Sequence, residues 1–266
     1  MPHTLRADQP PPTMTKHRRP EGMGGLVKGL AIIEAFGPSR IQLTISDAAK
    51  ATGTTPAAAR RCLLTLESLG YLSHDGKFFR ATPRMTRLGA AYAEVSPLPT
   101  LAQPCITAVR DELGETSSLA VLDGDSSLFV ARAEAIHIVS AGVRVGTRLP
   151  AYASASGRVL LGTLSDEELD LHLGGYEPKP STQNTLVTIA DIRRRVEEAR
   201  VQGASFTDEE LELGVRTMAV PVRDPAGRVH AAMTVSASAG RISLAEMRER
   251  FLPVLRREAE RLGRML

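Results

Sequence analysis

The residue types that usually perform catalysis are present in this chain, but their spacing does not match known catalytic patterns. Outside the N-terminal tail the histidines are scattered, at His74, His137, His172 and His230. There is no HExxH, no CxxC and no GKS or GKT phosphate loop. Ser154-Ala155-Ser156-Gly157 is similar to a nucleophile elbow, but GxSxG requires glycine at position 152 or 154, where tyrosine and serine stand. We therefore expect no enzyme, no metal site and no cofactor.

Other polar residues are arranged for binding a ligand. Ser154, Ala155 and Ser156 open a helix, whose free N–H groups and positive dipole suit a carboxylate. Thr234 and Ser236 alternate along a strand and so share one face, where a small polar ligand or the neighbouring backbone would satisfy them.

Charged side chains provide further candidate functional residues. Arg132, with Arg144 or Arg148, is a candidate to bind a second carboxylate group of the ligand. The alternative for each of these arginines is a position on the protein surface. The acidic run that begins at Asp208 and precedes Gly214 is interpreted either as acid/base or metal chemistry or as a solvated loop.

A third group of residues suits nucleic acid. In a helix over residues 55–69, about 100° per residue puts five residues on one buried face: Ala59, Cys62, Leu63, Leu66 and Leu69. Ala57, Arg60 and Arg61 then point outward, and arginine on a slim helix face can bond guanine or phosphate. The alternatives are a solvated helix face or a protein-interaction module.

The elements around this helix predict a winged helix-turn-helix. Leu26, Leu30, Ile33 and Phe36 form an apolar stripe, and Thr44 and Thr55 are N-cap residues of two further helices that a glycine turn joins. A hairpin follows around Asp75-Gly76. It carries Lys77 and Arg80 outward, with Phe78 and Phe79 expected in the core. A short helix over residues 84–97, with Met85, Leu88, Tyr92 and Val95 on one face, must bury that face against its own domains or a second copy.

The rest of the chain predicts an α+β domain. A helix carrying Ala102, Ile106, Val109 and Leu113 precedes strand-like runs at 116–122, 127–134 and 138–145. A Gly/Pro-rich loop then opens the helix near residue 158, and capping spacing marks helix starts at Ser165, Thr188 and Ser243. Two further strands, over 215–224 and 227–238, complete a central antiparallel sheet with helices packed on it.

Composition divides the chain in the same way. Residues 1–95 carry 13 basic against 7 acidic side chains, and residues 96–266 carry 20 against 23, so only the first part suits a polyanion. We expect no membrane span, since no run is long and apolar enough, and no secretory signal, since the first residues have no apolar core. Two cysteines make no disulfide framework. We expect a cytoplasmic protein: a disordered basic tail (1–21), a DNA-binding domain (22–83), a linker helix (84–97) and a ligand-binding domain (98–266).

Five segments carry a resemblance to a known family. They are LVKGLAIIEAFG, LTISDAAKATGTTPAAARRCLLTLESLGYL, GTRLPAYASASGRVLLGTLSDEEL, DEELELGVRTMAVPVRDPAGRV and the closing VSAS. From about Gly24 to its C-terminus the chain resembles the IclR family of bacterial transcriptional regulators. DGKFFRATPR, VARAE and RLPAYASASGRVLL are most similar to regulators of the β-ketoadipate pathway, which respond to protocatechuate, 4-hydroxybenzoate or β-ketoadipate.

The resemblance implies a fold and a partner set. It implies a winged helix-turn-helix, a linker helix and a GAF-like effector domain, in dimers or dimers of dimers. Double-stranded operator DNA is one expected partner and a small carboxylate effector, an aromatic acid or a β-ketoadipate-like acid, the other; RNA polymerase joins them if the protein is an activator. The alternatives are an enzyme and a ligand-binding module without DNA activity.

These arguments give two sets of expected site residues. The DNA-binding set is Lys28, Thr44, Ser46, Thr54, Thr55, Pro56, Ala57, Arg60, Arg61, Lys77 and Arg80. The effector-binding set, taken mostly from the resemblance, is Leu149, Tyr152, Ser154, Ala155, Ser156, Thr207, Asp208, Val215, Thr217, Thr234, Ser236 and Arg132. Relatives with small 2-oxo-acid effectors have Asp and Cys where this chain has Thr207 and Thr217, which favours a different effector.

Overall fold

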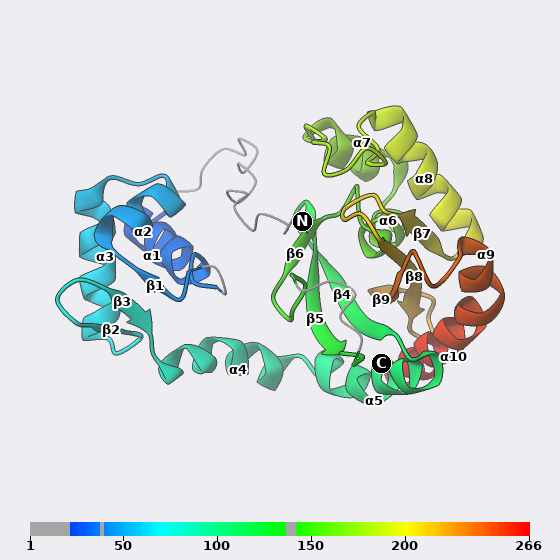
Figure 1. Cartoon of the computed structure of the whole chain (residues 1–266), viewed down its shortest axis with the longest axis horizontal. Coiled ribbons are helices and arrows are strands. Elements are labelled where there is room, and N and C mark those ends of the chain that lie inside the picture. The colour runs from blue at the N-terminus through cyan, green and yellow to red at the C-terminus, as the bar shows by residue number, and fades with distance from the viewer. Residues whose placement is uncertain (1–21, 38–39, 137–141) are drawn as a thin grey trace. The chain divides into compact units, whose positions relative to one another are not determined.

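The chain divides into two units between Val95 and Ser96 (Figure 1). The computed structural model describes residues 22–37, 40–136 and 142–266. The expected basic tail over residues 1–21 lies outside this range, as do residues 138–141 of the strand expected over 138–145. Each unit is described by itself.

The first unit is a winged helix-turn-helix. Its three helices are α1 (Gly24–Glu34), α2 (Ile45–Thr52) and α3 (Pro56–Ser68). Three short antiparallel strands, in the order β1-β3-β2, form the wing and its base: β1 (Gln42–Leu43), β2 (Leu72–His74) and β3 (Phe79–Ala81). A 3-10 turn, η1 (Pro83–Met85), leads into α4 (Thr86–Val95), which corresponds to the expected linker helix.

The helix starts and stops follow the local signals in the sequence. The Thr44 hydroxyl accepts from the N–H of Asp47, whose carboxylate accepts from the N–H of Thr44, so the capping box at α2 is complete. Gly53 ends α2 in the left-handed region, with φ of 61°. Thr55 caps α3 through the N–H of Ala58, and Pro56 is its first residue.

The buried face of α1 differs from the expected stripe. Ile32 is fully buried, whereas Leu26 and Leu30 are 60% and 47% exposed and lie with Met23 and Val27 on the outer side of the helix. The expectation for Leu69 is also wrong, because it is 52% exposed, at the end of α3, while Ala59, Leu63 and Leu66 are buried as expected. The outer face of α1 thus leaves apolar side chains in contact with solvent in the single chain.

The second unit contains one six-stranded antiparallel sheet in the order β6-β5-β4-β9-β8-β7. Its strands are β4 (Thr116–Asp123), β5 (Ser126–Ala133), β6 (Arg148–Pro150), β7 (Ser205–Asp208), β8 (Val215–Arg223) and β9 (Val229–Ser238). Its helices are α5 (Leu98–Leu113), α6 (Ala155–Leu161), α7 (Asp166–Gly174), α8 (Ile189–Gln202), α9 (Leu244–Glu246), the π-turn η2 (Met247–Phe251) and α10 (Leu252–Gly263).

The helices cover opposite faces of this sheet. Helices α5 and α10 lie against one face, where Leu119, Met218 and Val235 belong to the main core (Figure 1). Helix α6 lies against the other face, where Ala219 and Ala232 pack on it. Because side chains alternate along a strand, these contacts assign a face to every other residue of β4, β8 and β9.

Two strands differ from expectation. The described residues 142–146 form no strand; the partner of β5 is β6, inside the segment that the sequence indicated as a loop. Strand β7, which no pattern in the sequence predicted, pairs with β8 from Ser205↔Ala219 to Asp208↔Arg216. Both strands are only three or four residues long, so they carry too few residues for a period to be recognised.

Candidate functional site

The exposed side of α3 carries the side chains expected to read DNA. Thr55, Pro56, Ala57, Arg60 and Arg61 are all exposed. Within residues 22–37, 40–136 and 142–266, no carboxylate pairs with either guanidinium group. A helix start with small residues, free N–H groups and two unpaired arginines is a surface that can approach a phosphate backbone and the base edges of a groove.

The neighbouring candidates contribute less directly. Thr44 uses its hydroxyl in the α2 capping box, and Thr54 shares a hydrogen bond of 2.9 Å with the hydroxyl of Thr52. Ser46 is exposed in the first turn of α2, and Lys28 is half-buried on α1. The Thr44 and Thr54 hydroxyls therefore hold the turn that positions α3, whereas Ser46 remains available to a phosphate.

The two basic residues of the wing, Arg80 and Lys77, have different surroundings. Arg80 donates to Asp75 at 2.6 Å and to Gln42 of β1 at 2.8 Å, so it ties the wing tip to the sheet. Hydrogen bonds from the N–H groups of Phe78 and Lys77, and then from Arg80, hold the pKa of the Asp75 carboxyl well below its usual value. The Lys77 ammonium lies 4.9 Å from the centre of the Phe78 ring. Phe79 is buried as expected, but Phe78 is half-buried at the tip.

In the second unit, hydroxyl side chains gather on the α6 face of the sheet. Adjacent strands bring Thr207, Thr217, Ser236 and Thr116 into one row across β7, β8, β9 and β4. The hydroxyls of Thr217 and Ser236 share a hydrogen bond of 3.0 Å, and Thr207 donates to the carbonyl of Thr217 at 3.4 Å. Three of these residues were predicted for the effector site; Thr116 was missed.

The next row adds a cation to the same face. Thr234, Ser118 and Arg132 lie side by side on β9, β4 and β5. Arg132 donates from Nη1 to the Ser118 hydroxyl at 3.2 Å and from Nε to Glu134 at 3.1 Å, and its side chain is only 10% exposed. The two rows are two residues apart along each strand, or about 7 Å. This face of the sheet therefore combines a largely buried guanidinium group with several neighbouring hydroxyl groups.

The loop before α6 supplies apolar surface and structural hydroxyls. Leu149 pairs in register with Ser127, and the Tyr152 hydroxyl bonds the backbone of Lys179. Ser154 is the N-cap of α6, and the Ser156 hydroxyl lies 2.7 Å from that of Ser127, with both residues buried. Ala155, the first residue of the helix, packs against Ala219 and Ala232 of the sheet. The two serine hydroxyls expected to hold a carboxylate are thus engaged within the protein.

Strand alternation separates Asp208 from this cluster. Asp208 follows Thr207 and so faces the opposite side of the sheet, where it accepts from Arg216 at 2.6 Å. Arg216 also donates to the carbonyls of Ala239 and Ile242. Val215 is half-buried at the start of β8, on the hydroxyl face.

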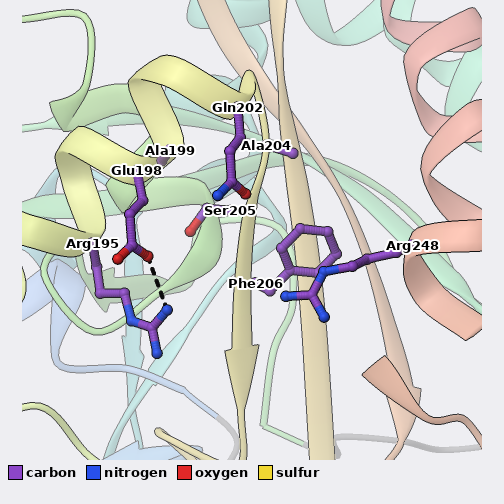
Figure 2. A pocket seen from close by; sticks show the side chains of 8 residues that line it. All are labelled: Arg195, Glu198, Ala199, Gln202, Ala204, Ser205, Phe206 and Arg248. Atoms are coloured by element: carbon purple, nitrogen blue, oxygen red, sulfur yellow. Dashed lines mark hydrogen bonds and ion pairs between the residues drawn. The ribbon is translucent and has the colours of Figure 1, made fainter. Parts of the chain in front are cut away.

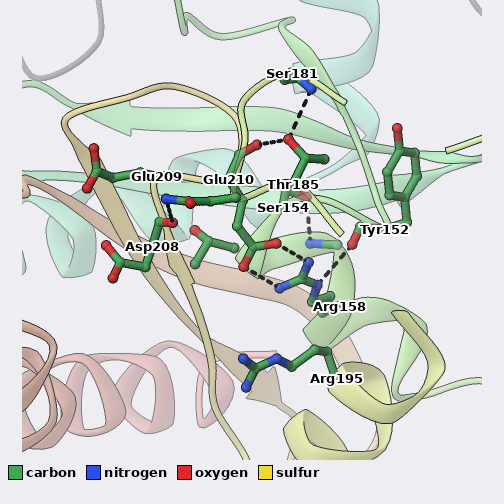
Figure 3. Close-up of polar contacts among 12 residues, drawn as sticks. Tyr152, Ser154, Arg158, Ser181, Thr185, Arg195, Asp208, Glu209 and Glu210 are labelled. Atoms are coloured by element: carbon green, nitrogen blue, oxygen red, sulfur yellow. Dashed lines mark hydrogen bonds and ion pairs between the residues drawn. The ribbon is translucent and has the colours of Figure 1, made fainter. Parts of the chain in front are cut away.

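The acidic run contains a buried ion pair that sequence reasoning missed. Arg158, on α6, is fully buried and donates from Nη1 to Oε1 of Glu210 at 2.9 Å and from Nη2 to Oε2, and from Nε to the carbonyl of Tyr152 (Figure 3). Glu210 is 7% exposed, so the interpretation of the run as a solvated loop is wrong at this position. The available signal was an arginine inside the otherwise apolar helix start SGRVLL.

A separate hollow lies between α8, β7 and η2 (Figure 2). Its walls include the Arg195–Glu198 pair and Arg248, whose guanidinium lies 4.7 Å from the centre of the Phe206 ring. None of the residues predicted for the effector site line this hollow.

The described residues contain neither a metal-binding cluster nor a membrane-spanning helix. No group of three or more His, Cys, Asp or Glu side chains is placed to hold a metal ion. No helix among these residues has the length and hydropathy needed to cross a bilayer.

Comparisons with known proteins agree with this architecture. Residues 25–76 match the IclR helix-turn-helix domain, and residues 90–264 match the bacterial transcriptional regulator IclR C-terminal domain. The Pca regulon regulatory protein of Pseudomonas putida is 39% identical over 89% of this chain and 81% of its own length. The p-hydroxybenzoate hydroxylase transcriptional activator of Acinetobacter baylyi is 32% identical over 94% of both chains.

A solved structure shares the whole fold. An IclR homologue from Microbacterium hydrocarbonoxydans, complexed with 4-hydroxybenzoate, is 25% identical and superposes with a TM-score of 0.76 over 91% of this chain and 100% of its own. The two domain matches together span nearly all the residues that the structure describes. This chain therefore belongs to the IclR family of bacterial transcriptional regulators and is a DNA-binding regulator.

Proposed function

We propose that this regulator controls genes for the catabolism of aromatic acids, and that a small carboxylic acid modulates its binding to operator DNA. The names of two relatives support the pathway, since one is a Pca regulon regulatory protein and the other a p-hydroxybenzoate hydroxylase transcriptional activator. The 4-hydroxybenzoate bound to the Microbacterium hydrocarbonoxydans homologue supports the ligand class. The protein acts by binding and performs no chemistry on its effector.

The observation that carries the proposal is Arg132 on the hydroxyl face of the sheet. A guanidinium whose side chain is 10% exposed needs an anion, and its described carboxylate partner, Glu134, is 67% exposed. A ligand carboxylate would form charge-assisted hydrogen bonds with Arg132, next to the Ser118 hydroxyl.

The rest of the face would define the ligand. The Thr217–Ser236 hydroxyl pair lies one row away, which suits a ring with a carboxylate at one end and a hydroxyl at the other. Leu149, Tyr152 and Val215 supply apolar lining, and Thr207 and Thr234 supply further hydroxyls. Ser154, Ala155 and Ser156 position α6, which forms the floor of the site.

Regulation would follow from linkage. If effector and operator each prefer one arrangement of the two α3 helices of a dimer, each changes the affinity of the other. The outer faces of α1 and α4 expose the apolar residues Leu26, Val27, Leu88 and Tyr92 and are the surfaces we assign to homodimer contacts. A dimer of dimers, and contact with RNA polymerase if the protein is an activator, belong to the same proposal.

The experiment combines calorimetry with DNA binding. Protocatechuate, 4-hydroxybenzoate and β-ketoadipate are titrated into the protein, and fluorescence anisotropy measures its affinity for a duplex selected from a random-sequence library. At least one acid should bind and change the affinity for the duplex. Failure of all three acids to bind would overturn the effector class, and binding without any change in duplex affinity would overturn the linkage.

A further inference from the structure

Arg158 joins two backbone segments that are far apart in the sequence. Its Nε donates to the carbonyl of Tyr152 at 2.9 Å, and its two Nη atoms donate to the two carboxylate oxygens of Glu210 (Figure 3). No part of the Arg158 side chain is exposed. A two-bond fork fixes both the distance and the direction between its partners, so this one side chain sets how the residue 152 backbone lies relative to residue 210.

Both segments border the hydroxyl face. Tyr152 lies in the loop between β6 and α6, two residues before the N-cap Ser154. Glu210 follows β7, whose Thr207 belongs to the hydroxyl row. Displacing either partner of Arg158 would therefore move a wall of the proposed effector site.

Glu210 is also held from its other side. The Thr185 hydroxyl donates to the carbonyl of Glu210, and the Thr182 hydroxyl donates to that of Glu209 at 2.6 Å. Glu209 has a φ of 58°, the left-handed region that side chains other than glycine adopt at a cost. Its carboxylate accepts from the N–H of Gly214 at 2.7 Å. The chain after β7 is thus clamped in an unfavourable conformation between the 182–185 segment and Arg158.

The other partner, α6, has little freedom to shift. A Cβ atom at Gly157 would lie 2.2 Å from the carbonyl oxygen of Ala151, so the helix touches the loop backbone directly. Arg158 is the next residue of this helix. The guanidinium therefore projects from a fixed base, and a movement of the loop is resisted by both contacts.

Fold stability alone does not require such a pair. Burying an ion pair costs desolvation free energy, and well-packed apolar residues of similar volume often stabilise a protein equally well or better. Apolar side chains make no directional hydrogen bonds, so they cannot fix the orientation of one backbone segment relative to another. We propose that Arg158 and Glu210 are the positioning pair of the effector site, which hold the 149–154 and 207–210 walls at the spacing that a carboxylic acid effector requires; this inference rests on the proposed function for its ligand.

The test separates positioning from packing. The double variant Arg158→Met with Glu210→Leu replaces the ion pair by apolar side chains, and we expect it to fold but to bind acid at least about tenfold more weakly. Arg158→Lys keeps the charge and loses the fork, and we expect a comparable loss. The control is Arg257→Lys, which makes the same change in the exposed Arg257–Glu112 pair between α10 and α5, on the other face of the sheet.

Two readouts are measured on the full chain. Calorimetry uses protocatechuate, 4-hydroxybenzoate and β-ketoadipate as probes, and hydrogen–deuterium exchange follows peptides from 149–154 and 207–214 without ligand. In both Arg158 variants the two segments should exchange faster together, by about tenfold, while Arg257→Lys leaves both unchanged.

The outcomes distinguish the two proposals. If no probe binds the unmodified protein, the effector class is wrong, and the exchange data still decide the role of the pair. Unchanged exchange in both segments, or unchanged acid affinity in a folded double variant, would overturn the positioning role. If the double variant fails to fold, Arg158→Lys alone decides by the same two readouts.

Discussion

Arg132 and Ser118 lie opposite each other on β5 and β4, and the guanidinium donates to the hydroxyl at 3.2 Å on the face of the sheet that α6 covers. The same face carries the hydroxyls of Thr217, Thr234 and Ser236. A cation and a set of hydroxyls, on a face where α6 itself packs on alanines, combine the two kinds of group that recognise a hydroxylated acid.

Replacing Arg132 should therefore weaken effector binding. A charge-assisted hydrogen bond contributes about 1.5–3 kcal/mol, so Arg132→Gln should lower acid affinity about ten- to hundredfold in calorimetry. Ser236→Ala should lower it by a smaller factor, because it removes a neutral hydrogen bond. The control is Arg110→Gln, which changes an arginine of α5 paired with Asp111 on the other side of the sheet. Normal acid binding by Arg132→Gln would show that the carboxylate lies elsewhere.

Operator binding should depend steeply on salt. If the winged helix neutralises six or more phosphates, affinity falls by roughly a thousandfold or more between 50 and 200 mM salt. Lys77→Ala should weaken all sequences alike and reduce the salt slope, because the wing lysine meets the backbone. Anisotropy titrations of an operator and a scrambled duplex measure both effects. An affinity independent of salt would contradict this phosphate-contact model.

Replacing Arg61 should change the base preference of the protein, whereas replacing Lys77 should not. Arg61 is exposed on α3, and no carboxylate in the described part of the chain pairs with it. If it reads guanine, Arg61→Ala should cost about 1–3 kcal/mol on the operator and relax the base preference at one position. Comparing duplex selections made with the two proteins tests this, and an unchanged consensus would assign Arg61 to the phosphate backbone. Arg80→Ala would not test a DNA contact alone, because the hydrogen bonds of Arg80 to Asp75 and Gln42 hold the wing in place.

The features that sequence predicted depend on neighbouring residues. The capping box at Thr44, the cap at Thr55 and the turn at Asp75 each bond partners within three residues, so a short window contains the whole cause. The alternation of Thr234 and Ser236 is likewise local, and the structure confirms that they share one face, which is the one that α6 covers.

The features that sequence missed depend on distant partners. Arg158 and Glu210 are 52 positions apart, and no local pattern in DEEL indicates that Glu210 is buried while Glu209 bonds Gly214. Asp208 was expected in the effector site from the resemblance, and without β7 the side of the sheet on which it lies could not be predicted. The outer residues of α1 satisfied a helical period equally well on either side, so periodicity alone could not select the buried one.

Assembly should depend on the apolar face of α4. Leu88 and Tyr92 are 43% and 45% exposed and Val95 is 81% exposed, whereas Met85 packs against the winged-helix core. Leu88→Glu should lower the oligomeric state in sedimentation velocity and weaken operator binding. Ala90→Glu is the matched control, because it places the same charge on the opposite side of the helix. An unchanged mass with intact DNA binding in Leu88→Glu would show that this face packs only within one chain.

The histidine of α7 should make the second unit sensitive to acid. Burial lowers the pKa of His172 below its ordinary value of 6.5, and its ring lies edge-on to Tyr176 at 5.3 Å. The Nε2 atom has no hydrogen-bond partner among the described residues. His172 therefore binds a proton at a higher pH in the unfolded chain than in the folded chain. Its protonation does not lower the free energy of unfolding above about pH 6.5. Below that, the free energy of unfolding decreases as the pH falls towards the pKa of His172 in the folded chain.

The variant His172→Phe keeps a ring against Tyr176 and removes the proton site, so its melting temperature should fall less between pH 7.5 and 5.5 than that of the unmodified protein. Scanning calorimetry on the full chain measures both, and His74→Gln, which changes an exposed histidine of the wing, controls for the general effect of removing a histidine. Nearby Asp125 opposes the shift by favouring the charged imidazole, so Asp125→Asn should steepen the dependence. Equal slopes in the His172→Phe variant and the unmodified protein would show that His172 has the same pKa in the folded and the unfolded chain, which would contradict the effect of burial.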